Sequence, residues 1–175
     1  MYGYELFFEA DQRQPNEPQS RPSPAELIDF ACKEISSLVG TRRAFINLTR
    51  DVILSGCCDR LPATRVALEV LEDVPTDADV IAELTRLARL GYQIALDDFV
   101  PMPARTRLVD LAYIVKIDVL ATGNRSLGDL AHELGSFDVR LLAEKIETKD
   151  TLRLAERLGF DYFQGFFLGR PTSEW

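Results

Sequence analysis

Short apolar runs alternate along this chain with longer stretches in which apolar residues recur every three or four positions. The short runs are typical of buried strands, and the longer stretches are typical of helices with one apolar face. A serial alternation of strands and helices favours a parallel sheet covered by helices. The seven runs predicted as strands are residues 2–8, 43–48, 65–71, 92–97, 114–117, 139–143 and 162–166.

The predicted helices carry start and stop signals. Ser23 and Pro24 begin the first helix, because serine caps a helix start and proline fits its first turn, and Gly40 ends it. The segment VPMPA at 100–104 has two prolines, which we expect to delay the next helix to residue 105. The predicted helices are residues 24–39, 51–54, 77–90, 105–112, 127–134 and 148–158.

Polar side chains stand at the carboxyl ends of these apolar runs, which is the feature that points to chemistry. A closed barrel of parallel strands gathers all of these ends at one mouth, where such barrels hold their active sites. Carboxylates, an amide and one lysine at a single mouth indicate a divalent-metal site for a phosphate substrate. The residues are Glu5, Asn47, Glu69, Asp97, Asp98, Lys116, Glu144 and Gln164.

Length and charge narrow the picture further. The chain has 175 residues, which suggests one domain, whereas a complete eight-unit barrel needs about 200 to 250. We therefore expect a compact, trimmed or incomplete barrel. The formal net charge of −8 argues against nucleic acid or an anionic membrane as the main partner. An anionic ligand would need metal ions to bind at an acidic mouth.

Other site classes find little support. Cys32, Cys57 and Cys58 lack zinc spacing and favour free thiols in a reducing cytoplasm. The single histidine, His132, is expected to be exposed on a helix, which argues against histidine catalysis and zinc binding. No signal peptide is evident, and no apolar run reaches the ~20 residues needed to span a bilayer.

Seven motifs in order resemble one family along almost the whole chain. YELFF, FINLT, LEVLEDV, ALDDF, VKID, AEKIET and DYFQGFFLGRP match the EAL domain, the bacterial cyclic-di-GMP (c-di-GMP) phosphodiesterase module. The motifs LEVLEDV, AEKIET and GFDYFQGFF look most like those of EAL domains that precede an HDOD domain. The resemblance implies an α/β fold, an EAL-type (β/α) TIM-like barrel, here shortened. Both ends look cut from a longer protein, so we expect residues 1–175 to be one EAL-like domain without its final helix, with an HDOD domain following.

The resemblance also implies roles for individual residues. Hydrolysis of one phosphodiester of c-di-GMP would give linear pGpG, with two Mg²⁺ or Mn²⁺ ions assisting. Glu144 would act near the attacking water, Lys116 would neutralise phosphate charge, and Gln164 would contact the ligand. Glu72 and Glu147 would hold the metal ligands in place. The implied metal ligands are Glu5, Asn47, Glu69, Asp97 and Asp98.

Two departures from the family pattern weaken the expected activity. The signature arginine that grips a phosphate is replaced by Glu9, which removes a bidentate cation. Arg13 or Arg21, from the proline-rich loop predicted at 9–24, are alternative cations. The segment DDFVPMPARTR at 97–107 stands where active members of the family have a glycine-rich loop that couples metal binding to dimerisation. These changes favour a degenerate site.

Alternatives stay open at this point. Lys116 could pair structurally with Glu144, and the whole polar mouth could be an ion-pair network that binds nothing. The chain could be a weak phosphodiesterase, a receptor that binds c-di-GMP without cutting it, or a scaffold for a protein partner. A fully active phosphodiesterase and a homodimer are also compatible with the sequence.

Overall fold

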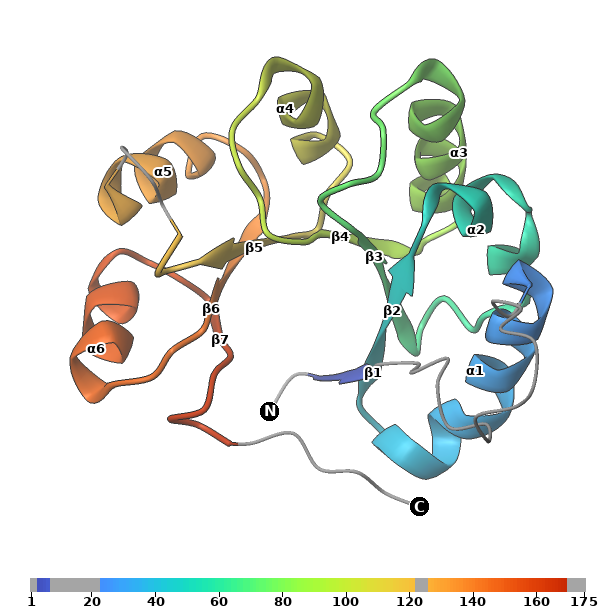
Figure 1. The fold of residues 1–175 in the computed structure, drawn as a ribbon, viewed down its shortest axis with the longest axis horizontal. Helices are drawn as coiled ribbons and strands as arrows, with labels where there is room; N and C mark the ends of the chain where they lie inside the picture. The colour runs from blue at the N-terminus through green and yellow to red at the C-terminus, as the bar shows by residue number, and fades with distance from the viewer. Residues whose placement is uncertain (1–2, 7–22, 122–125, 170–175) are drawn as a thin grey trace, which may run out of the picture.

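The computed structural model describes residues 3–6, 23–121 and 126–169. Seven parallel strands form one sheet in the order β1 to β7, and each strand pairs with its neighbours along the chain. The sheet curls into an open half-barrel with the helices on its outer side (Figure 1). The strands are β1 Gly3–Leu6, β2 Arg43–Leu48, β3 Val66–Val70, β4 Gln93–Leu96, β5 Ile114–Asp118, β6 Arg140–Glu144 and β7 Tyr162–Phe163. This is the expected (β/α) barrel architecture in shortened form.

The helices follow the predicted pattern closely. A capping box joins Ser23 and Glu26 at the start of α1, and Asp77 caps α3 through its side chain. The helices are α1 Pro24–Val39, α2 Arg50–Leu54, α3 Ala78–Arg89, α4 Pro103–Val109, α5 Leu127–Leu134 and α6 Lys149–Arg157, with a 3-10 helix at Cys57–Arg60. None of the helices in the described part has the length and apolar character needed to cross a membrane.

Most boundaries differ from the sequence prediction by one residue or so, and helix α4, which ends at Val109 and not at 112, and strand β7 differ most. Helix α4 begins at Pro103 and not at residue 105, because a proline in the first turn loses no helical hydrogen bond. Strand β7 ends at Phe163, and residues 166–168 form a turn in which Phe166 and Phe167 are exposed. The prediction of a strand reaching 166 was therefore wrong. Glu9, Arg13 and Arg21 lie outside the described residues.

The core has two parts, separated by the sheet. The larger part lies between sheet and helices and includes Ile28, Leu84 and Leu87. The smaller part lines the inner side of the sheet and comprises Phe45, Ala67, Ala95, Ile114 and Leu142, one from each of β2 to β6. Because side chains alternate across a strand, the residue two positions later points to the same inner side.

This alternation places the candidate site directly above the inner apolar layer. Advancing two positions along each strand from the inner core residues reaches five of the predicted site residues in turn. They are Asn47, Glu69, Asp97, Lys116 and Glu144. The inner surface is thus apolar at one level and polar at the next, at the carboxyl ends of the strands.

Candidate metal and phosphate site

Lys116 lies at the centre of a buried ionic cluster. Its side chain is 2% exposed, and its Nζ atom forms an ion pair with Glu69, which is fully buried. The same Nζ atom lies 2.9 Å from Asp97 Oδ1, 2.9 Å from Glu144 Oε1 and 3.5 Å from Glu5 Oε2. Four strand ends therefore converge on one ammonium group. The pairing of Lys116 with Glu144, left open by the sequence, is present as one contact of four.

Two polar atoms beside this cluster have no hydrogen-bond partner. Asn47 and Glu69 face each other in the register of β2 and β3. Asn47 Oδ1 and Glu69 Oε2 are both buried and unpartnered within the described residues. Glu69 can donate to Asp97 only when it is protonated. A proton or a cation is therefore needed to join these oxygens, since buried acceptors without donors are costly.

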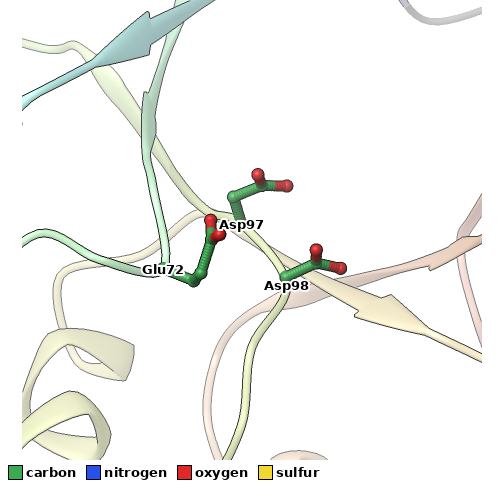
Figure 2. A group of neighbouring side chains, drawn as sticks. All are labelled: Glu72, Asp97 and Asp98. Atoms are coloured by element: carbon green, nitrogen blue, oxygen red, sulfur yellow. The ribbon is translucent and has the colours of Figure 1, made fainter. Parts of the chain in front are cut away.

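A second group of carboxylates adjoins the first. One oxygen each from Glu72, Asp97 and Asp98 lie within 4.8 Å of one another. Glu72 lies in the segment after β3, and Asp97 and Asp98 directly follow β4 (Figure 2). Asp98 adopts φ 37°, and its buried Oδ1 atom also lacks a hydrogen bond. Asp97 belongs to both groups because it also contacts Lys116. Hard oxygen donors of this kind suit Mg²⁺, Mn²⁺ or Ca²⁺, so the residues present fit a divalent cation.

Of the remaining predicted site residues, Gln164 and Glu72 contact the two carboxylate groups, whereas Glu147 does not. Gln164 lies just after β7, and its Nε2 atom donates a hydrogen bond of 2.8 Å to Glu5 Oε2. This bond joins the two edges of the open sheet. Glu147 is exposed and takes part in none of the contacts that join the cluster within the described part. Glu72 lies directly beside Asp97 and Asp98, whereas the sequence analysis expected it only to support the metal ligands.

The sequence did not indicate Arg105, which supports the aspartate pair from α4. Its side chain is buried, its Nη2 atom donates to the backbone oxygen of Asp97 at 3.0 Å, and its guanidinium lies 6.0 Å from the centroid of the Phe99 ring. Burial lowers the pKa of Arg105, and nearby carboxylates such as Glu72 oppose this. We expect Arg105 to fix the backbone that presents Asp97 and Asp98.

Burial controls the protonation of this cluster. It raises the pKa of Glu69 to about 9 and that of Glu144 to about 7, and the charge of Lys116 offsets only part of each rise. Burial acts the same way on Asp97, but Lys116 and a hydrogen bond from Glu69 outweigh it and hold its pKa below the ordinary value. Burial opposes the charge of Lys116, yet the surrounding carboxylates raise its pKa, so it stays charged.

These shifts predict that stability without metal falls as pH rises. A carboxyl whose pKa is higher in the folded state stabilises the fold fully below its unfolded pKa, and this is lost as pH rises through the folded pKa. For Glu144 the window runs from 4.5 to about 7, which corresponds to roughly 3 kcal/mol. We expect urea unfolding in EDTA to show this decrease between about pH 5 and 8.

The matched control is Glu144→Gln, which cannot titrate. We expect the step that ends near pH 7 to vanish, leaving only the decrease toward higher pH that Glu69 contributes. Identical pH profiles for the parent chain and Glu144→Gln would show that Glu144 keeps an ordinary pKa in the folded state.

Known proteins share the motifs and the fold of this chain. A family model described as the EAL domain matches residues 27–171. The chain is 31% identical over 175 residues to cyclic di-GMP phosphodiesterase CdgJ of Vibrio cholerae, which covers 97% of this chain and 40% of CdgJ. It is 28% identical over 176 residues to the uncharacterized protein YuxH of Bacillus subtilis, covering 96% of this chain and 43% of YuxH. The chain thus spans less than half the length of these two curated relatives.

Solved structures agree on the architecture. The PaMucR phosphodiesterase in complex with c-di-GMP superimposes with a TM-score of 0.69 and 27% identity, over 85% of this chain and 76% of that one. Bacillus subtilis YkuI, solved with c-di-GMP and calcium, gives a TM-score of 0.68 at 21% identity, over 85% of this chain and 42% of YkuI. With a family match that covers most of its length and seven strands in the expected barrel order, the chain belongs to the EAL domain family.

Proposed function

We propose that this chain is a c-di-GMP signalling domain that binds the nucleotide through divalent metal ions and has a weak or inactive phosphodiesterase site. The proposal is supported chiefly by the unpartnered oxygens of Asn47 and Glu69, which face the same cluster as Asp97. A purely structural ion-pair network gains nothing from leaving such acceptors without donors. The relatives with solved nucleotide complexes, PaMucR and YkuI, supply the substrate class.

The metal ligands in this proposal follow the gathered side chains. Glu5, Asn47, Glu69 and Asp97 would hold one Mg²⁺ or Mn²⁺, and Asp97 with Asp98 would help to hold a second. Glu72 would serve beside the aspartate pair, in view of its distance to them. When bound, the ions would supply a water activated for attack and stabilise the charge on the leaving oxygen.

The chain's own residues would perform the rest of the chemistry. Glu144, with a pKa of about 7, can hold or release a proton near neutral pH, as a general base requires. Lys116 stays charged and would attract the phosphodiester while it holds four carboxyl groups in position. Gln164 would orient Glu5 through their hydrogen bond and offer its amide to the ligand. Glu147 is proposed only as a more distant support.

Reduced activity is proposed from two sequence features. Glu9 replaces the arginine that the family uses on a phosphate, and a carboxylate there would repel the ligand. The segment 97–107 contains two prolines, and α4 begins already at Pro103, so this loop has less freedom to rearrange around a ligand. We further propose that the chain is one EAL domain of a longer protein in which an HDOD domain follows.

The deciding experiment is a long incubation of concentrated protein with c-di-GMP and Mn²⁺ or Mg²⁺, with pGpG measured by chromatography. We expect slow, metal-dependent product that EDTA abolishes. Glu5→Ala should lower the rate about 100-fold, since it loses a metal ligand and a contact of Lys116. Glu147→Ala is the control carboxylate and should leave the rate within about threefold.

Other outcomes would revise the proposal in steps. Absence of product at any enzyme concentration removes the hydrolase part, and a calorimetric titration with c-di-GMP and Ca²⁺ then separates receptor from scaffold. Product formation equal in the parent chain and Glu5→Ala would sink the assigned site. A chain that neither cuts nor binds the nucleotide is a scaffold stabilised by its ion-pair network.

A further inference from the structure

Lys145 has an unusual backbone conformation at the mouth of the half-barrel. It directly follows β6 and adopts φ 57°, and Asp98 is the other described non-glycine residue with positive φ. The left-handed region costs a side-chain-bearing residue about 1 kcal/mol relative to glycine. The turn is packed closely against the next segment: the Ile146 N–H donates a 2.9 Å hydrogen bond to the backbone oxygen of Gln164, and a Cβ atom on Gly165 would lie 2.3 Å from the backbone of Ile146. Lys145 therefore cannot relax out of this conformation easily.

The ammonium group of Lys145 reaches over the acidic mouth. Its Nζ atom forms an ion pair with Asp118 and lies 3.9 Å from Asp98 Oδ1. Asp98 is one of the three carboxylates drawn in Figure 2, so the cation borders that group. The Lys145 side chain is 51% exposed, whereas Lys116 is 2% exposed. In the described part of the mouth, Lys116 is thus buried, whereas Lys145 is a cation that a ligand can reach from solvent.

Structural stability does not account for a lysine at this position. The Lys145 side chain is 51% exposed and that of Asp118 is 11% exposed. An ion pair whose cation is this open to solvent contributes about 0–1 kcal/mol, which no more than offsets the cost of the left-handed backbone. Glycine would fit the turn without strain. Strained backbone that stability does not explain is concentrated at functional sites. The ammonium group, and not the turn, is therefore the property that a lysine adds here.

We infer that Lys145 binds a phosphate group of the cyclic dinucleotide and supplies at the mouth a positive charge that the family's signature position, occupied by Glu9, does not provide. This inference rests on the proposed function, since it concerns the same ligand. Lysine suits the role because its long stem lets a point charge move from Asp118 to an incoming phosphate. A cation beside Asp98 would also reduce the repulsion between this carboxylate and an anionic ligand.

The test is calorimetric titration of the purified chain with c-di-GMP in Ca²⁺, alongside urea unfolding of each variant. We expect Lys145→Gln to weaken binding at least about tenfold and Lys145→Arg to stay within about threefold of the parent. Lys145→Gly should bind as weakly as Lys145→Gln while unfolding at an equal or higher urea concentration, because glycine relieves the backbone strain. Lys149→Gln removes an exposed lysine at the start of α6 and should bind like the parent.

The outcomes separate this inference from the proposed function. If the parent chain shows no binding, the proposed function fails and the inference fails with it. If the parent binds and Lys145→Gln binds within about twofold, the inference alone is overturned. A loss of affinity in Lys145→Gly together with an unchanged or raised stability supports a direct ligand contact, whereas parallel losses of affinity and stability would assign Lys145 a structural role only.

Discussion

Lys116→Met is expected to destabilise the fold by about 3–5 kcal/mol at pH 7.5 in EDTA, as measured by urea unfolding. The substitution keeps the length of the side chain but removes the ammonium group on which four carboxylates converge. Removal of one partner from a buried ionic cluster leaves the others uncompensated, and this costs more than the cluster contributes when intact. Asp97 is directly affected, since its lowered pKa depends on Lys116.

An exposed lysine provides the matched control. Lys33→Met on α1 removes the same charge from the surface and is expected to change stability by about 0.5 kcal/mol or less. A loss below about 1 kcal/mol for Lys116→Met would mean that the carboxylates are held apart by other contacts. The comparison separates the central role of Lys116 from a general effect of net charge.

Divalent metal should restore part of the lost stability. Ions bound only by the folded state stabilise it by about 2.7 kcal/mol at a concentration 100 times the dissociation constant. In Lys116→Met the carboxylates lack their internal cation, so we expect Mn²⁺ to raise stability more than it does in the parent chain. Equal gains in both proteins would indicate that the metal ligands and the partners of Lys116 are separate sets.

Strand and site placement followed from the sequence because both depend on simple periodicities. Each inner core residue precedes a site residue by two positions, as Ala67 precedes Glu69 and Ile114 precedes Lys116. The alternation of a strand and the shared direction of parallel strands therefore suffice to gather these side chains. No tertiary knowledge was needed to predict that polar strand ends meet at one mouth.

Contacts within the mouth could not be obtained in this way. Lys116 and Glu69 are 47 positions apart, and the sequence cannot tell whether one carboxylate or four share the lysine. Arg105 was missed because a buried arginine and an exposed one look alike in a short polar helix. Lys145 was missed because nothing in the motif AEKIET reveals that its lysine, which directly follows Glu144, adopts a left-handed backbone conformation.

Asp97→Asn is expected to have the largest effect on function, because Asp97 is common to both carboxylate groups. Its Oδ1 atom accepts a hydrogen bond of 2.9 Å from Lys116, and it lies within the group formed with Glu72 and Asp98. Asparagine keeps the shape but removes the charge, and its amide cannot bind a second cation as a carboxylate does. We expect the stabilisation by Mn²⁺ to disappear and pGpG formation to fall by about 1,000-fold or more.

Asp98→Asn is the matched control for this change. Asp98 belongs to only one of the two groups and has no hydrogen bond to its buried Oδ1 atom. We therefore expect it to retain part of the stabilisation by Mn²⁺ and to lose about 10–100-fold in rate. Thermal unfolding with and without Mn²⁺ tests the metal-binding difference even if the parent chain proves inactive. If Asp97→Asn gains as much stability from Mn²⁺ as the parent, the ion binds elsewhere, and the two carboxylate groups serve only the fold.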